Sequence, residues 1–294
     1  MNSKNIIWGL TIVGCMFSCT AKFDDYNTNH NVTNKVTPAM LATDMLLNIT
    51  QLGGAKYSLF DNMLNKQIAW SEGSQQDEQY NRLGRVSFST YTNITNCQKM
   101  LLEAETSSEP VQNSYKGLAK FVKAYNLFHL SMQVGDIPYS DSNKGEEGNI
   151  TPKYDTQKDV MLQILNDLEE ARSLFSHGDY FDGDPILNGD PQLWKKTVTS
   201  FELKVLINLS KKENDQDLNI KQRFAEIAVS SDLLTSNDDN FQLVYSNTAG
   251  QLYPLYQNNH AQYLMISSTI IDPMKEFKDY RMFLLYKSSR LSVE

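Results

Sequence analysis

The 294-residue chain is poor in cysteine, in positive charge and in strand-like alternation, and each shortage excludes a class of protein. The chain has three cysteines, Cys15, Cys19 and Cys97. If an N-terminal signal peptide is removed before Cys19, as argued below, Cys97 is the one internal thiol and has no intrachain partner. An extracytoplasmic fold would then depend on its apolar core and not on disulfides. The net charge of −8 and the pI near 5.1 argue against nucleic-acid binding, which requires clustered Lys and Arg. Neutral polar ligands are compatible with this charge.

Residues that could support catalysis are also sparse. His30, His129, His177 and His260 are far apart, and none shares a helix face with another ligand-type residue at metal-site spacing. No glycine-rich phosphate loop appears, and residues 179–184 lack the closing glutamate of an EF-hand, so we interpret them as a turn. The acidic pairs are sequence neighbours, whereas glycoside-cleaving carboxylates converge from separate elements at about 5 to 10 Å. We therefore predict a non-catalytic protein with no metal and no cofactor.

The first 36 residues predict a secretion signal followed by a tether. Lys4 supplies the positive start, and residues 6–14 form a short apolar run. A membrane-spanning helix needs about 20 apolar residues, so this run is interpreted as the core of a signal peptide. Residues 1–18 are thus the predicted lipoprotein signal peptide. Residues 19–36, which are rich in Asn, Thr and Asp, are the predicted tether.

Cys19 is the predicted lipidated residue. A cut before Cys19 leaves the longer apolar core in the signal, and the polar chain begins directly after it. Cys15 also follows small residues and is the alternative, and secretion with unmodified thiols is a third possibility. One acyl chain binds membranes only marginally, at about 10⁴ M⁻¹, whereas several chains hold stably. A multiply acylated Cys19 would anchor the domain without a transmembrane segment.

Apolar residues recur at three- and four-residue intervals over much of the remaining chain, which predicts a series of amphipathic helices. Typical helix starts occur at Thr37-Pro38, Glu109-Pro110, Thr156 to Asp159, and Asp190-Pro191. Helices in series, joined by loops, indicate antiparallel helical pairs. The apolar stripes are Met40, Leu41, Met45 and Leu46; Leu59, Phe60, Met63, Leu64, Ile68 and Ala69; Val111, Tyr115, Leu118, Ala119, Val122, Tyr125 and Phe128; Val160, Met161, Ile164, Leu165, Leu168, Ala171 and Phe175; Trp194, Val198, Phe201, Val205 and Leu209; and Ile220, Phe224, Ile227 and Ala228.

Five motifs follow one another over almost the whole chain. They are FDDYNTN (23–29) after Cys19, GDIPYS (135–140), TPKYDTQ (151–157), NGDPQLWKK (188–196) and LKVLINLS (203–210). In this order and spacing they resemble the SusD/RagB-like outer-membrane nutrient-binding lipoproteins of Bacteroidetes. The resemblance implies a mostly all-α, tetratricopeptide-like scaffold of helical pairs with long irregular loops over residues 37–294.

The same resemblance implies a location and a partner. The protein would be lipid-anchored at the outer surface of the outer membrane, as a lid over a SusC-like TonB-dependent transporter. It would pass oligosaccharides or other nutrients to that transporter. The acidic pair Asp24-Asp25, just after the lipidated cysteine, would belong to a surface-export signal.

The family differs from this chain at the C-terminus. Family members are considerably longer, and in them a segment like 278–283 leads into further loops and helices. Here the sequence ends at Glu294, and residues 284–294 no longer resemble the family. We therefore expect a C-terminally truncated member or a fragment, in which part of the usual ligand surface is missing.

Two loops have the composition of a sugar site. Aromatic rings stack on the C–H faces of sugars, and amide or charged side chains pair with their hydroxyls, so the two kinds of residue should alternate. Residues 70–82 and 245–260 show this mixture, whereas Trp194 and Cys97 are predicted to be buried in the core. The candidate ligand residues are Trp70, Gln75, Gln76, Tyr80, Arg82, Tyr253, Tyr256, Asn258 and Asn259.

Two other functions stay open. A tetratricopeptide-type scaffold that binds a protein or peptide should carry a continuous amide-lined groove without a platform of rings. A surface glycoside hydrolase should carry two carboxylates that face each other in a cleft.

Overall fold

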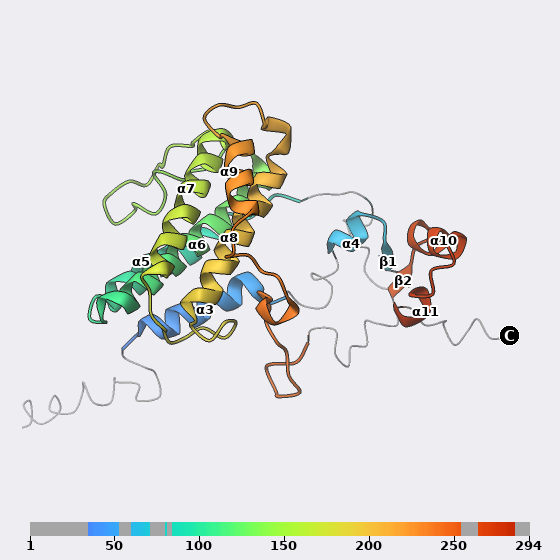
Figure 1. Ribbon diagram of the computed structural model, residues 1–294, viewed down its shortest axis with the longest axis horizontal. Coiled ribbons are helices and arrows are strands. Elements are labelled where there is room, and N and C mark those ends of the chain that lie inside the picture. Colours follow the sequence, from blue (N-terminus) through green and yellow to red (C-terminus); the bar gives the residue numbers. More distant parts are fainter. Residues whose placement is uncertain (1–34, 53–59, 71–79, 81–83, 254–263, 286–294) are drawn as a thin grey trace, which may run out of the picture. The chain divides into compact units, whose positions relative to one another are not determined.

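A computed structural model describes residues 35–52, 60–70, 80, 84–253 and 264–285. The chain divides into two units, 1–37 and 38–294, and of the first only residues 35–37 are described. Most of the described chain is a series of helices in which each packs on the next (Figure 1). These helices are α3 (Pro38–Thr50), α5 (Tyr91–Ala104), α6 (Glu109–Val134), α7 (Gln157–Ser176), α8 (Pro191–Asn208) and α9 (Ile220–Ala228).

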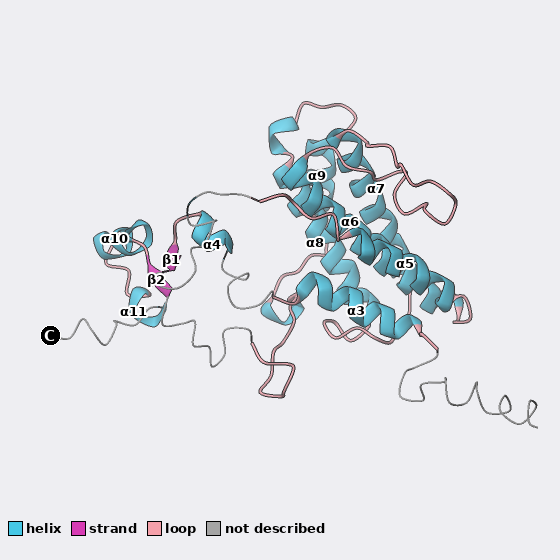
Figure 2. Ribbon diagram, turned by 180° about the vertical axis from the view of Figure 1, so that it is seen from behind, coloured by secondary structure: helices cyan, strands magenta, loops and turns pink. Residues whose placement is uncertain are grey.

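The central element of this helical body is α6. It contacts α5 and α7, its neighbours in sequence, and also α3 and α8. The remaining elements are short, and strands are confined to one two-stranded ribbon in the described ranges (Figure 2). The mostly all-α fold with helical pairs is therefore confirmed. The short elements are α4 (Phe60–Leu64), β1 (Ile68–Trp70), η3 (Ser210–Lys212), η4 (Asn237–Asp239), β2 (Leu264–Ile266), α10 (Ser268–Glu276) and α11 (Met282–Leu285).

Local sequence signals explain where the main helices begin and end. The Asp190 carboxylate accepts hydrogen bonds from the N–H groups of Gln192 and Leu193 ahead of Pro191, the first residue of α8. The Thr156 hydroxyl accepts from the Asp159 N–H at 3.2 Å and donates to the Asp159 carboxylate at 2.7 Å. Asp is one methylene shorter than the usual Glu of a capping box, so its carboxylate reaches the threonine hydroxyl and not the backbone.

One predicted helix is wrong in part. The stripe from Leu59 to Ala69 continues as a helix only to Leu64, and Ile68 and Ala69 belong to strand β1. Lys66 has a φ of 60°, a left-handed conformation that breaks the helix between the two elements. Strand β1 pairs with β2, far away in the sequence, and local periodicity carries no information about that partner.

Helix α5 was not among the predicted helices. Its buried face consists of Ile94, Cys97, Met100 and Ala104, at three- and four-residue spacing, but Asn and Thr interrupt the apolar signal. Elsewhere the stripes mark the buried faces well, although Met40 and Phe224 are partly exposed. No helix within the described ranges combines the length and the apolar character that a membrane span requires.

A cluster of aromatic rings fills the core. Trp194 on α8 is fully buried, stacks on Phe175 with 5.8 Å between ring centroids, and meets Phe121 edge-on at 5.3 Å. Such ring pairs add to the burial of apolar area. Cys97 is also buried, and burial raises the pKa of its thiol to about 12. The predictions that Trp194 and Cys97 lie in the core are confirmed.

The loop between α7 and α8 is organised by one buried carboxylate, that of Asp184. It accepts hydrogen bonds from the N–H groups of Ile186, Leu187 and Gly189 at 2.9 to 3.1 Å, and from the Trp194 indole N–H at 2.7 Å. Every oxygen of Asp184 is thus used within the protein, so this segment is the turn that the sequence predicted.

We expect Asp184→Asn to destabilise the fold by about 2 to 4 kcal/mol, because its amide NH₂ would face N–H donors and leave them unpaired. Urea unfolding followed by far-UV circular dichroism measures this loss. Asp182→Asn, the same change at an exposed position two residues away, is the matched control and should have little effect. Equal stability of the two variants would contradict the assigned role of Asp184.

Candidate functional site

The structure describes three of the nine predicted ligand residues. Tyr80 is exposed, Tyr253 is 44% exposed, and Trp70 is the last residue of β1, with its side chain outside the description. The other candidates, and the predicted lipid site, fall outside the described residues. These are Gln75, Gln76, Arg82, Tyr256, Asn258, Asn259 and Cys19.

The strand pairing nevertheless relates the two predicted loops to each other. In the antiparallel ribbon Trp70 lies opposite Leu264. The first loop begins at Trp70, and the second loop, 245–260, precedes Leu264 in the chain, so both adjoin the same end of the ribbon. The strand pairing thus relates two segments that the sequence indicated separately, through Trp70 and Leu264.

The described part of the second loop carries a ring pair, in which Tyr253 is exposed and Tyr245 is half-buried. Tyr245 and Tyr253 meet edge-on with 5.5 Å between ring centroids. The hydroxyl oxygen of Tyr245 accepts a hydrogen bond at 2.8 Å from the N–H of Leu52, just after α3. This bond ties the ring pair to the helical body.

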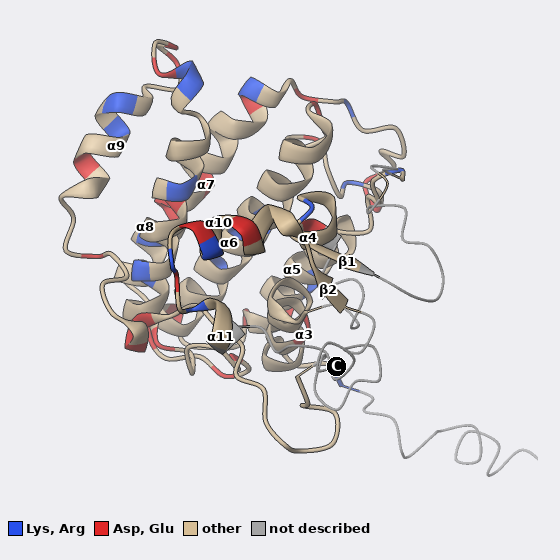
Figure 3. Cartoon of the chain, turned by 90° about the vertical axis from the view of Figure 1, so that its right-hand side faces the viewer, with Lys and Arg blue, Asp and Glu red and all other residues tan. Residues whose placement is uncertain are grey.

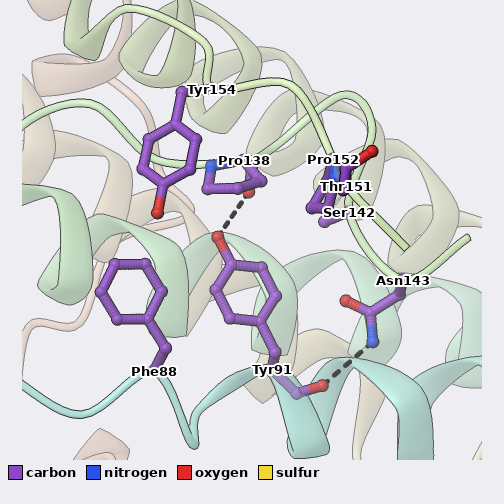
Figure 4. Close-up of a pocket in the computed structure, with 8 residues that line it drawn as sticks. All are labelled: Phe88, Tyr91, Pro138, Ser142, Asn143, Thr151, Pro152 and Tyr154. Atoms are coloured by element: carbon purple, nitrogen blue, oxygen red, sulfur yellow. Dashed lines mark hydrogen bonds between the residues drawn. The ribbon is translucent and has the colours of Figure 1, made fainter. Parts of the chain in front are cut away.

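A pocket with aromatic walls lies where the chain enters α5 (Figure 4). We call it the aromatic pocket, and its volume is about 550 Å³. The rings of Phe88 and Tyr91 stack with 6.1 Å between centroids, and the hydroxyl of Tyr154 points toward them. Phe88 is 38% and Tyr154 57% exposed, so ring surface faces solvent. The lining residues are Phe88, Tyr91, Pro138, Ser142, Asn143, Thr151, Pro152 and Tyr154.

The carboxylate of Asp155 holds together the two loops that form one side of this pocket. It accepts hydrogen bonds from the N–H groups of Tyr139 and Ser140, at 2.9 and 2.8 Å, and from the Ser140 hydroxyl. Partial burial acts in the opposite direction, but these donors hold the pKa of Asp155 below its ordinary value. The Tyr139 hydroxyl donates to Asp167 at 2.6 Å, which fixes the first loop to α7.

Two further bonds place the polar groups of the pocket. The Tyr91 hydroxyl donates to the carbonyl oxygen of Pro138 at 2.5 Å, and burial, with the nearby Tyr154 and Asp155, raises the pKa of Tyr91. The Asn143 amide donates to the Tyr91 carbonyl and to the Thr95 hydroxyl. Its oxygen Oδ1 is buried and accepts no hydrogen bond from any described residue. A ligand hydroxyl can supply that missing donor.

A second, smaller pocket adjoins the same entry segment. Ser87 and Thr90 line this pocket of about 210 Å³ together with Asn126 and His129. Burial, with the charge of Lys204, lowers the pKa of His129 to about 4, so its ring is neutral at physiological pH. His129 is thus a half-buried, neutral ring in the wall of this pocket.

The lining of the aromatic pocket is uncharged. No carboxylate is among its lining residues, and the described chain contains no cluster of His, Cys, Asp or Glu that could hold a metal. Sequence reasoning missed this pocket because its lining comes from three separated segments. The alternation of rings with Ser, Thr and Asn around residues 87–95 and 151–154 was the available signal.

Comparisons with known proteins give a consistent result. Residues 29–293 match a family described as SusD-like, starch-binding associating with outer membrane. A SusD homologue from Bacteroides fragilis is 49% identical, with a TM-score of 0.78 over 84% of this chain and 52% of that chain. A second from the same species is 35% identical, with a TM-score of 0.72 over 85% and 52%. No curated protein matches the chain.

A third solved structure, from Bacteroides vulgatus, is described as an outer membrane protein involved in nutrient binding. It is 29% identical, with a TM-score of 0.73 over 84% of this chain and 53% of that chain. The chain thus spans about half the length of the solved structures that it matches.

We expect Asp155→Asn to lower the free energy of unfolding by about 1 kcal/mol at pH 7, through weaker bonds to the two loops. A carboxylate with a lowered pKa stabilises the fold above its ordinary pKa of about 3.9 and loses that effect as the pH falls below it. The difference from wild type should therefore persist at pH 5 and shrink at pH 3. Urea unfolding at the three pH values measures it, with exposed Glu147→Gln as control; a difference that grows at pH 3 would contradict this account.

Proposed function

The chain belongs to the SusD-like family, and on this premise we propose that it is a non-catalytic nutrient-binding lipoprotein that captures a neutral oligosaccharide at the cell surface. The family resemblance inferred from the sequence is confirmed by the match over residues 29–293. The family is associated with the outer membrane and with starch binding. The nature of the ligand, the partner and the anchor belong to the proposal.

The aromatic pocket is the observation that carries this function. Its volume of about 550 Å³ falls within the range of about 300 to 1,000 Å³ that small-molecule sites occupy. Exposed rings at Phe88 and Tyr154 offer flat surfaces for the C–H faces of a sugar, and Asn143 Oδ1 offers an acceptor for a hydroxyl. Because no charged residue lines the pocket, a neutral sugar fits it better than an acidic or basic one.

The predicted loops would add further ligand contacts. Trp70, Tyr80 and Tyr253 bring rings, and the amides at positions 75, 76, 258 and 259 bring hydroxyl partners. The position of both loops next to the same end of the β1–β2 ribbon supports their joint use. We therefore retain all nine predicted residues as candidate ligand contacts.

The anchor and the partner are proposed from the N-terminal sequence and from the family resemblance. Signal peptide 1–18, lipidated Cys19 and tether 19–36 would hold the helical domain, 37–294, at the outer face of the outer membrane. There it would work with a SusC-like TonB-dependent transporter, to which it delivers its ligand. Nucleic acid is not a proposed partner, in accordance with the net charge of −8.

The alternatives are less well supported. A peptide-binding scaffold is expected to have an amide-lined groove without a platform of solvent-facing rings, whereas such rings line the aromatic pocket. A hydrolase needs two facing carboxylates at about 5 to 10 Å, and the lining of this pocket contains none.

Isothermal titration with maltoheptaose, cellohexaose and chitohexaose tests the proposed function. We expect heat of binding with at least one of these glycans, and about a tenfold weaker affinity, or about 1.4 kcal/mol, in Tyr154→Ala and in Phe88→Ala. Tyr154→Phe, which keeps the ring, should retain most of the affinity. Tyr280→Ala, which removes a tyrosine that is 76% exposed elsewhere, is the matched control.

The results of this titration distinguish an error in the proposed function from an error in the proposed binding site. Absence of binding with every glycan would refute glycan capture by this chain. Binding that Tyr154→Ala and Phe88→Ala leave unchanged would reject the aromatic pocket alone, and a loss in Trp70→Ala would then place the ligand at the predicted loops.

Metabolic labelling with radioactive palmitate in a Bacteroidetes host tests the anchor. We expect label in the wild-type protein and in Cys15→Ala, and none in Cys19→Ala, because only the first residue after the cut is acylated. Label that persists in Cys19→Ala but disappears in Cys15→Ala would assign the anchor to the other cysteine.

A further inference from the structure

Glu202 on α8 is a buried acid without a hydrogen-bond donor. The residue is 1% exposed, and its Oε2 accepts no hydrogen bond from any described residue. The nearest cation is Arg172 on α7, whose Nη1 lies 3.5 Å from Oε2, beyond good hydrogen-bonding distance. Buried carboxylates in proteins are normally well supplied with donors, so this one calls for an explanation.

The carboxyl group lines a pocket of about 380 Å³, which we call the Glu202 pocket. Helices α7, α8 and α9 each contribute side chains to it, and all but one of these side chains are polar or charged. No aromatic ring is among them, so this pocket differs in kind from the aromatic pocket. The lining residues are Glu169, Arg172, Glu202, Asn219, Arg223, Glu226, Ile227 and Ser230.

Residues of both charge signs lie on α7 and α9 (Figure 3), and four of them line the Glu202 pocket. Helix α7 presents Glu169 and Arg172, and α9 presents Arg223 and Glu226. Arg223 is held in place because its Nη2 donates to Asn166 at 3.3 Å. With Glu202 ionised, three carboxylates and two guanidinium groups leave a net charge of −1, which disfavours an anionic ligand.

The protonation of Glu202 reflects its burial. Burial raises the pKa of Glu202 to about 7, and Glu169 acts in the same direction, whereas Arg172 and Arg223 oppose the shift. The carboxyl is therefore only partly ionised at neutral pH. A ligand that donates hydrogen bonds to it would favour the ionised form.

We propose that the Glu202 pocket binds neighbouring hydroxyl groups of a neutral polyol or sugar. The Glu202 carboxylate accepts from the hydroxyls, and the guanidinium groups of Arg172 and Arg223 donate to their oxygens. Without rings, the pocket recognises a hydroxyl-bearing edge, whereas the aromatic pocket offers surfaces for the face of a sugar. This site goes beyond the proposed function, since it uses none of the residues of the aromatic pocket.

Other ligand classes fit less well. Two guanidinium groups beside Glu202 repel an ammonium ion or a metal, and the described chain has no cluster of three metal-ligand side chains. The net charge of the lining opposes a phosphate or a carboxylate. A ligand with alternating donors and acceptors and no charge matches the pocket best.

NMR titration of the full chain with myo-inositol and methyl α-D-glucopyranoside tests the proposal. The methyl resonance of Ile227, the one apolar lining residue, reports on this pocket and is assigned with Ile227→Val. We expect it to shift with at least one probe in the wild type. A carboxyl with a pKa of about 7 is ionised in about a tenth of molecules at pH 6 and about nine tenths at pH 8, so affinity should rise about tenfold over that range.

Glu202→Gln should weaken binding at pH 8 at least about tenfold and abolish the pH dependence, since the amide does not ionise. Arg223→Gln, at the pocket edge, should weaken binding without removing that dependence, and provides a second test if Glu202→Gln fails to fold. Glu103→Gln, at an exposed site on α5, is the matched control. Tyr154→Ala should also leave this binding intact, which keeps the result separate from that of the aromatic pocket.

Three results would overturn the proposal. One is the absence of any Ile227 shift with both probes, as expected if water alone fills the pocket. The second is wild-type affinity in Glu202→Gln, and the third is binding that does not change between pH 6 and pH 8.

Discussion

The fold depends on how buried carboxylates obtain their hydrogen bonds. Asp184 receives four N–H donors, three from its own loop and one from the Trp194 indole. That single group therefore fixes the connection between α7 and α8 and, at the same time, the largest side chain of the core. Trp194 in turn contacts rings from α6 and α7, so the position of the loop and the packing of the bundle are coupled.

Three acidic residues, Asp184, Asp155 and Glu202, differ in whether the protein supplies hydrogen-bond donors to their carboxylates. Asp184 and Asp155 are each surrounded by donors of the protein, and each holds loops in place. Glu202 is as buried as Asp184 but has no hydrogen-bond donor among the described residues, only the cation of Arg172 at 3.5 Å. A satisfied carboxylate is part of the framework, whereas an unsatisfied one beside a polar pocket has capacity left for a ligand.

The features that could be predicted from the sequence are those that local interactions determine. Helix starts at Thr156 and Asp190 follow from side chains that cap the next few residues, and the core position of Trp194 follows from a helical stripe. Strand β1 was missed because its partner is distant in sequence, and a three-residue strand has no periodicity of its own. The aromatic pocket was missed for a related reason: Asp155 joins loops whose association no single segment reveals.

The pairing of β1 with β2 also bears on how the two predicted sugar loops are interpreted. Composition alone marked residues 70–82 and 245–260 as separate candidates, each with rings and amides. Because Trp70 lies opposite Leu264, both loops adjoin the same end of a ribbon. An extended ligand such as an oligosaccharide benefits from several weak contacts that are held at fixed positions, since each added contact then costs little further ordering. The ribbon is small, but it fixes Trp70 and Leu264, which adjoin the two polar segments, opposite each other.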